Sequence, residues 1–162
     1  MPNSSELSPN HSNGVVVAGG IFEMYSGTIS GNTVEKNGGG VWVKHTGTFS
    51  VSSAPIIKDN KMGSVANNVY LGSGNTITVD SALTGGAEIW VTAVPAATEG
   101  NPKVFTAGYN DHNGTTEPSA FFHSDNVAYS VGANEAGEAQ LTVPSTPAPI
   151  LVSGISLPPP KR

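Results

Sequence analysis

Short runs of alternating apolar and polar residues recur through the first ninety positions of the chain, with Gly, Asn, Ser or Asp between the runs. Aligning the chain with itself at a period near 27 residues gives three related rows, at positions 13–37, 38–67 and 68–91. Strict alternation is typical of a β-strand that buries one of its two sides. Each row therefore predicts three short strands that are separated by turns.

The three rows agree at individual positions. Residues 15–17 (VVV) align with 41–43 (VWV) and with 69–71 (VYL), and TISGN at 28–32 aligns with IIKDN at 56–60. Within the aligned runs, alternation directs every second side chain to one common side. The residues predicted to point to this side are Val15, Val17, Val41, Val43, Val69, Leu71, Phe22, Phe49 and Ile77.

A period of this length with three short strands predicts an all-β fold of the parallel β-helix type, with about three coils. Each coil buries apolar side chains inside and passes its backbone hydrogen bonds to the coils above and below. An antiparallel sandwich is the alternative for evenly spaced short strands, but a sandwich does not require side chains to recur at matching positions. Asn32 and Asn60 occupy matching positions and are expected to form a short internal asparagine ladder with a structural role.

The pattern changes after residue 91. The segment PAATEGNP at 95–102 is rich in turn-forming residues, and KVFTAGYN then resumes a strand. Further on, AYSV and AQLTV flank the glycine-containing loop GANEAGE, which predicts a β-hairpin. An antiparallel β cap of this kind would cover the apolar end of the last coil. Its expected apolar contributors are Phe121, Phe122, Tyr129 and Leu141.

These patterns divide the chain into four parts. The predicted parts are a polar N-terminal tail (1–13), parallel β-helix coils (14–94), a C-terminal β cap (95–143) and a Pro-rich tail or linker (144–162) in which ILVSGISL could add a strand. We find no comparable cap before the first coil. The open edge of the first coil favours end-to-end self-association or further coils upstream. We expect the natural protein to have more coils before this first coil.

Six short motifs follow one another in the order of the coils: GTISGNT, NGGGVWV, GTFSV, ANNVYL, NTITV and LTGGAEIWV. Together with the closing segment SDNVAYSVGANEAGEAQL, they resemble the repeats of large surface proteins of Gram-positive bacteria, in which coils of the type GGGVYV–GTFTM–GTISGNTA build a right-handed parallel β-helix. The resemblance covers residues 14–141. It implies a right-handed β-helix in an extracellular, cell-surface or adhesin-like setting, as a fragment of a larger exported protein. Most members of that family have no assigned activity.

The chain also departs from that family. The loop at 94–116 shows no clear repeat, and Trp42 and Trp90 are bulkier than the residues usual at their positions. These two tryptophans therefore need an explanation of their own.

The composition narrows the possible partners. Only 12% of the residues are charged, the net charge is -5 and basic residues form no run, so nucleic acids and anionic membranes are poor candidates. The absence of Cys excludes disulfides, thiolate zinc sites and cysteine nucleophiles. No apolar stretch approaches the roughly 18 residues of a membrane span. The start of the chain lacks a signal-peptide pattern, so an exported natural protein would be represented here by a mature form or a fragment.

Candidate catalytic and metal-binding residues are sparse. The glycine run at 38–40 lacks the P-loop pattern GxxxxGK[ST] and is interpreted as a corner between two rows. The four His residues lack metal-ligand spacing, and KDN and SDN are weak candidates for calcium loops, so no metal or cofactor is expected. We see no acid–base pair among the carboxylates of the coils, which are Glu23, Glu35, Asp59, Asp80 and Glu88.

One surface feature indicates binding. The alternation that turns the flanking valines inward directs Trp42 outward, and the same holds for Tyr70 and Trp90. With Val16 these side chains would form a column with a spacing of about 4.8 Å per coil. Sugar rings could stack on such a column, or the aromatic rings could serve only to pack the coils against one another.

The sequence therefore predicts a non-catalytic structural or adhesive module of a bacterial surface protein. The first alternative is a carbohydrate-binding module that uses Trp42, Tyr70 and Trp90, with host or cell-wall glycans or surface proteins as partners. The second alternative is an enzyme of the polysaccharide lyase or glycosidase type, which rests on fold analogy alone.

Overall fold

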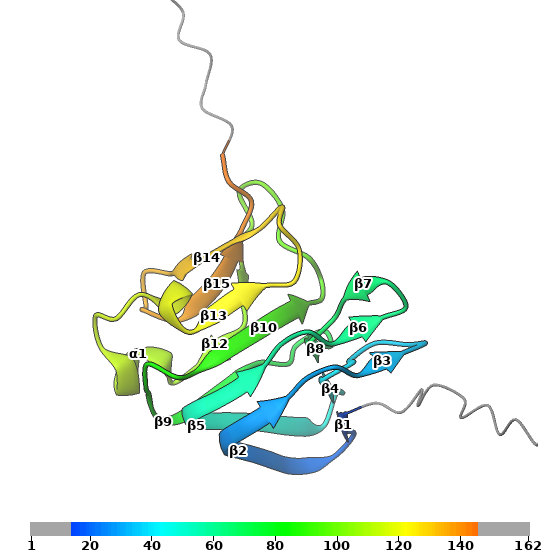
Figure 1. Cartoon of the computed structure of the whole chain (residues 1–162). Helices are drawn as coiled ribbons and strands as arrows, with labels where there is room; N and C mark the ends of the chain where they lie inside the picture. Colours follow the sequence, from blue (N-terminus) through cyan, green and yellow to red (C-terminus); the bar gives the residue numbers. More distant parts are fainter. Residues whose placement is uncertain (1–13, 146–162) are drawn as a thin grey trace, which may run out of the picture.

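The strands wind into a parallel β-solenoid of about three turns, which is followed by a small antiparallel sheet (Figure 1). The computed structural model describes residues 14–145. The predicted all-β solenoid with an antiparallel cap is confirmed within that range. The predicted tail at 1–13 and the ILVSGISL segment lie outside the described residues.

The first two turns each contain three strands, and the third turn contains two strands before β10 carries the chain into the next turn. After β6, the short strand β7 folds back and pairs with β6 as an antiparallel hairpin. In chain order the strands are β1 (Val15–Val17), β2 (Gly20–Ile29), β3 (Thr33–Val34), β4 (Val41–Val43), β5 (Gly47–Ile57), β6 (Lys61–Met62), β7 (Val65–Ala66), β8 (Val69–Leu71), β9 (Ile77–Leu83) and β10 (Glu88–Ala93).

Strands at matching positions of successive turns pair in parallel and in the predicted register. Val15 lies opposite Val41 and Val41 opposite Val69, while Phe22 lies opposite Phe49. The rings of Phe22 and Phe49 stack with their centroids 5.5 Å apart. All residues predicted to share one side belong to the interior, where Val15 and Phe22 in the first turn are partly buried and the others are buried.

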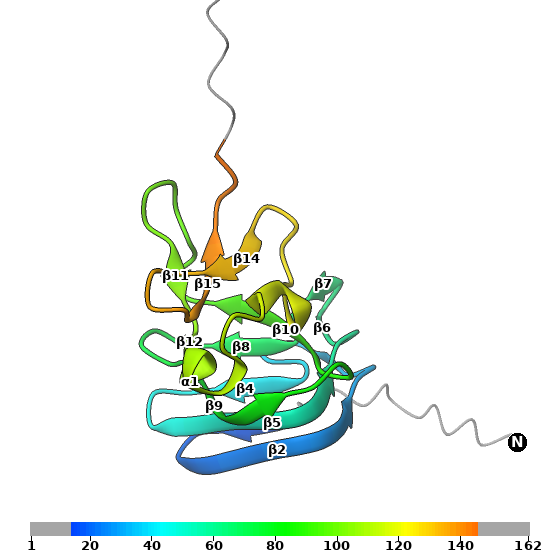
Figure 2. The ribbon, with the colours of Figure 1, turned by 90° about the vertical axis from the view of Figure 1, so that its left-hand side faces the viewer.

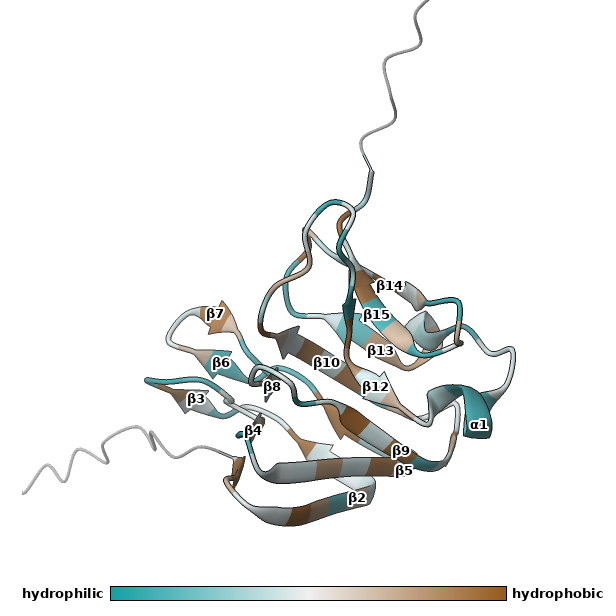
Figure 3. Ribbon diagram, turned by 180° about the vertical axis from the view of Figure 1, so that it is seen from behind, coloured by the Kyte–Doolittle hydropathy of each residue, from teal (hydrophilic) through white to brown (hydrophobic). Residues whose placement is uncertain are grey.

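This interior stack is the main source of stability. Burial of one Val, Leu, Ile or Phe side chain stabilises a fold by about 1.5–3 kcal/mol. Figure 3 shows hydrophobic positions as brown bands on β5, β9 and β10. The interior positions of β5 and β9 coincide because the third turn repeats the alternation of the second.

Parallel pairing continues past the predicted end of the coils at residue 94. Strand β13 (Phe122–Ser124) pairs with β10, and β12 (Thr106–Ala107) pairs with β9. Helix α1 (Tyr109–Asn113) and the 3-10 helix η1 (Pro118–Ala120) lie between these two strands, and no repeat pattern predicted them. The start of a fourth turn is therefore interleaved with the cap.

The cap is a three-stranded antiparallel sheet in the order β11–β15–β14. Its strands are β11 (Lys103–Val104), β14 (Ser130–Ala133) and β15 (Ala139–Thr142), and the predicted hairpin is confirmed as β14–β15. Figure 2 shows this sheet at the end of the stack opposite β2. The apolar residues expected in the cap all lie in the core or pack against it: Phe121, Phe122, Tyr129 and Leu141.

The opposite end of the stack presents the outer edge of β2. Within residues 14–145, β2 pairs only with β5. Two large side chains on this strand are exposed, Ile21 at 69% and Tyr25 at 59%. The open first edge expected from the sequence is therefore present in the described part of the chain, and end-to-end self-association stays a prediction.

The glycine run at 38–40 forms a corner that lies in contact with the next turn. The amide of Gly39 donates to the carbonyl of Asn67 (2.9 Å), and the amide of Gly40 donates to the carbonyl of Asn68 (3.0 Å). A Cβ atom at Gly39 would lie 2.8 Å from the backbone N and O of Lys61. The corner interpretation is confirmed, because the neighbouring backbone leaves no room for a side chain.

We expect Gly39→Ala to destabilise the fold by about 1–3 kcal/mol, since the added methyl group forces two backbone segments apart. Gly85→Ala is the matched control, because a Cβ atom there meets no atom within 4 Å. Urea unfolding of the two variants measures the difference. Equal stability of the two variants would contradict the tight contact at this corner.

Candidate functional site

The outward face of β4 and β8 carries a pair of aromatic rings. Trp42 lies opposite Tyr70 across the two strands. Their ring centroids are 6.3 Å apart and the ring planes meet at 85°, which is the edge-to-face arrangement that aromatic pairs prefer. Both side chains are partly exposed. Two of the three aromatic residues expected in the outward column therefore come together.

The residue that lies next to Tyr70 in the outward column is Thr92. The expectation that Trp90 takes this place is wrong. The register pairs Thr92 with Tyr70 and Trp90 with His123. The difference arises because β10 starts early, at Glu88, and runs without a corner from the end of β5 into the column of β8. Trp90 thus lies two residues before the position that faces Tyr70.

Trp90 belongs to a separate cluster. Its ring centroid lies 5.0 Å from that of His123, and its Nε1 donates to Glu88 Oε1 at 3.1 Å. The other carboxylate oxygen of Glu88 forms an ion pair with Lys58 Nζ at 2.7 Å. Hydrogen bonds from Lys58 and Trp90 lower the pKa of the Glu88 carboxyl. The ion pair with Lys58 and the hydrogen bond from Trp90 hold the Glu88 carboxylate in its charged form. These contacts explain the position of Glu88 in structural terms.

A lysine covers one face of the Trp42 ring. Lys44 follows Trp42 by two residues, so alternation places both on the outward side of the chain. Its Nζ lies 4.0 Å from the centroid of the Trp42 ring, within the range of a cation–π interaction. The hollow around this pair has a volume of about 270 Å³ and is lined by Asn37, Trp42, Val43, Lys44, His45, Tyr70 and Gly72.

Two further hollows lie near this first one. The second, of about 480 Å³, shares Asn37 and Tyr70 with the first and also reaches Thr92, Asp125 and Asn126. The third, of about 200 Å³, shares Thr92 and Asn126 with the second.

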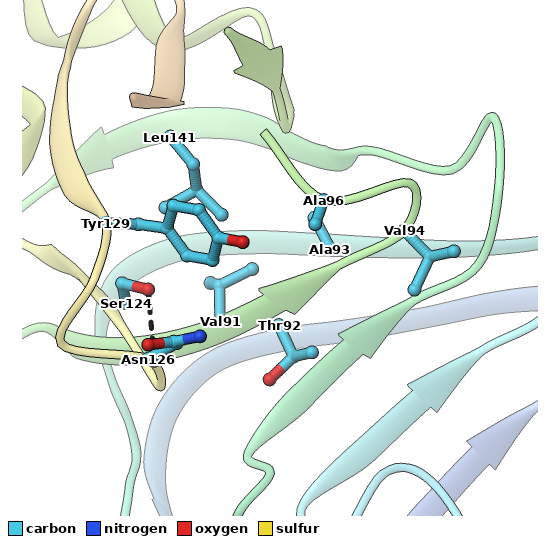
Figure 4. Close-up of a pocket in the computed structure, with 9 residues that line it drawn as sticks. All are labelled: Val91, Thr92, Ala93, Val94, Ala96, Ser124, Asn126, Tyr129 and Leu141. Atoms are coloured by element: carbon cyan, nitrogen blue, oxygen red, sulfur yellow. Dashed lines mark hydrogen bonds between the residues drawn. The ribbon is translucent and has the colours of Figure 1, made fainter. Parts of the chain in front are cut away.

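Figure 4 shows the third hollow, where the ring of Tyr129 lies near Leu141 and Val91 and the backbone N–H of Asn126 donates to Ser124 Oγ. The first two hollows adjoin each other at Asn37 and Tyr70, and we call these two the aromatic groove.

A ladder of buried amides supports the groove from inside. Asn32 Nδ2 donates to Asn60 Oδ1 (2.9 Å), as the sequence predicted, and Asn60 Nδ2 donates to Asn68 Oδ1 (2.9 Å). The ladder ends on Asp125, whose carboxylate accepts from the backbone and the side chain of Asn68. Thr92 Oγ1 also donates to Asp125 Oδ2 at 2.7 Å. The ladder thus connects the corners of successive turns with the floor of the groove.

Sequence reasoning missed the roles of Lys44 and Asp125. The signal for Lys44 was its spacing of two residues from Trp42. In the sequence, Asp125 stands out only as part of SDN, a weak candidate for a calcium loop. Its role depends on a contact with Asn68 across 57 residues of chain, and no local pattern encodes such a contact.

Glu23 has no carboxylate beside it in its strand column. Glu23 lies beside Ser50, and Ser50 lies beside Thr78. Within the described range, no three or more His, Asp or Glu side chains gather where a metal ion could bind. No helix of this range is long and apolar enough to cross a membrane.

Known protein-family models, curated proteins and solved structures gave no match to the chain. The fold therefore follows from the structure itself. The bacterial cell-surface setting rests on the motif resemblance alone.

Asn60→Ala should destabilise the fold by about 3 kcal/mol, since each buried polar group that loses its partner costs about 1–3 kcal/mol. The variant leaves the backbone and side-chain amides of Asn32 without their acceptor, Asn60 Oδ1, and the carbonyls of Ile29 and Lys58 without their donor, Asn60 Nδ2. Asn101→Ala is the control, because Asn101 is exposed. Urea unfolding provides the comparison, and a loss no larger than that of the control would refute the ladder's structural role.

Asp125 predicts a pH dependence of stability. Burial raises the pKa of its carboxyl above 3.8, against the hydrogen bonds from Asn68 and Thr92, which lower it. The folded state therefore binds the proton more tightly than the unfolded state, and stability falls as pH rises through the folded pKa. We expect the stability of the wild type relative to Asp125→Asn to decrease as pH rises from about 3 to 7. Urea unfolding across this range tests the sign, and an increase would show that the hydrogen bonds outweigh burial.

Proposed function

We propose that the chain is a non-catalytic adhesive module of a bacterial cell-surface protein and that the aromatic groove binds carbohydrate. The observation that carries this proposal is the partly exposed Trp42–Tyr70 pair, which lines the first hollow and of which Tyr70 also lines the second. The motif resemblance supports the extracellular setting. The solenoid supports the structural part of the role, because its paired strands hold the groove in one shape.

The residues around the aromatic pair suit a sugar. A sugar ring has an apolar C–H face and a rim of hydroxyl groups, so its binding site needs aromatic surface beside polar groups. The first two hollows supply the rings of Trp42 and Tyr70 together with the side chains of Asn37, Asn67 and Asn126. The Oδ1 atoms of Asn67 and Asn126 accept from the backbone amides of Gly38 and Ala128, and their Nδ2 groups can donate to the hydroxyl rim.

The repeat of the solenoid also suits a chain of sugars. Trp42, Tyr70 and Thr92 lie on consecutive strands, and consecutive strands are about 4.8 Å apart. This spacing is close to the length of one sugar unit along a glycan. An oligosaccharide that lies across the strands would therefore meet a new side chain of the groove at each unit.

Binding to a glycan array tests the proposal with two tryptophan variants. Trp42→Ala should weaken binding at least about tenfold, which corresponds to about 1.4 kcal/mol. Trp90→Ala is the matched control, because Trp90 lies outside the aromatic groove and packs on His123. Thermal unfolding of both variants verifies that each one is folded.

Two outcomes would contradict the proposal. The first is a wild-type protein that binds no glycan on the array, which would leave the solenoid with a structural role only. The second is equal binding by folded Trp42→Ala and the wild type, which would assign the aromatic pair to packing between turns.

A further inference from the structure

We infer that the aromatic groove takes an acidic glycan, with a carboxylate-bearing sugar in the first hollow and a neutral sugar in the second. This inference rests on the proposed carbohydrate binding and adds the chemical class of the ligand. It starts from Lys44, the cation that lies over the Trp42 ring.

The backbone of Lys44 is fixed by hydrogen bonds to neighbouring segments. Its amide donates to the carbonyl of Val17 (2.9 Å), and its carbonyl accepts from the amide of Gly47 (2.8 Å) and from Asn75 Nδ2 (3.2 Å). The side chain lies along the Trp42 ring and is partly buried. Binding of an anion to this ammonium therefore costs less ordering entropy than binding to a free surface lysine.

The ammonium of Lys44 has no carboxylate partner among residues 14–145. The one ion pair in this part of the chain joins Lys58 to Glu88, in the Trp90 cluster. The protein as a whole carries a net charge of -5, so Lys44 provides a positive position on a mostly negative molecule. His45 lines the same hollow and offers a further nitrogen for a hydrogen bond. A carboxylate is the group that this first hollow fits best.

Recognition in the first hollow has to come from side chains. Strand β4 is paired with β1 on one edge and with β8 on the other, and β8 is paired with β4 and β10. An acidic peptide that bound by adding a strand would need a free edge, and these strands have none. A carboxylate carried on a sugar ring matches both the ammonium and the adjacent aromatic surface of Trp42 and Tyr70.

The second hollow has the opposite electrostatic character. Asp125 lines it, and its carboxylate is fixed by hydrogen bonds from Asn68 and Thr92. A second carboxylate on the ligand would be repelled here, whereas the amides of Asn67 and Asn126 suit hydroxyl or acetamido groups. The groove therefore favours a glycan in which an acidic unit alternates with a neutral one.

Isothermal titration with defined tetrasaccharides tests the inference. The probes are a hyaluronan tetrasaccharide, which alternates glucuronate with N-acetylglucosamine, its carboxyl-reduced counterpart, and tetragalacturonate, in which every unit is acidic. We expect the hyaluronan tetrasaccharide to bind about tenfold more tightly than either of the others. Its binding should also weaken as salt is added, because the contact is charged.

Two lysine variants test whether Lys44 causes the preference for the acidic tetrasaccharide. Lys44→Gln should lose the preference for the acidic over the carboxyl-reduced tetrasaccharide. Lys103→Gln should keep it, because Lys103 is partly exposed like Lys44 but lies on β11, outside the groove.

The outcomes separate this inference from the proposed function. Binding of neutral glycans that depends on Trp42, without a preference for the acidic probe, would overturn the inference and leave the carbohydrate-binding function in place. Tetragalacturonate that binds as well as the hyaluronan tetrasaccharide would also overturn it. Binding of a poly-glutamate peptide through Lys44 in place of any acidic glycan would overturn it as well. Absence of binding to any glycan would reject both proposals.

Discussion

The close contact between the corners of successive turns is the constraint on which the rest of the structure depends. Parallel strands have to lie about 4.8 Å apart, and at the corner this spacing leaves no volume for side chains on Gly39 and Gly40. The amide of Asn60 completes the same corner by hydrogen bonds to Asn32 and Asn68. Backbone contact and the amide ladder together fix the register of the turns, and the register places the apolar residues inside.

This register also determines which side chains lie next to one another on the outward face. Because each turn lies directly over the next, Trp42, Tyr70 and Thr92 come from three strands and still line one groove. The amide ladder reaches the groove through Asp125, which binds both Asn68 and Thr92. The groove is thus supported by the same contacts that stabilise the fold, and a ligand meets it already formed.

The parts of the structure that repeat could be predicted from the sequence. The interior positions, the glycine corner and the Asn32–Asn60 contact follow from the period, because stacked turns require the same side chain at the same place. The prediction failed at Trp90, where β10 has no corner and shifts the register by two residues. Helix α1 and the contact of Asp125 with Asn68 depend on packing of segments far apart in the chain, which no local pattern encodes.

The central claim is that the face of Trp42 is the surface on which the protein meets its ligand, and NMR of the tryptophan indoles tests it most directly. The chain has only two tryptophans, so its ¹H–¹⁵N spectrum contains two indole N–H signals, which single substitutions assign. During titration with the hyaluronan tetrasaccharide, we expect the Trp42 signal to shift and the Trp90 signal to stay in place. A shift confined to Trp90, or no shift at saturating ligand, would contradict the account.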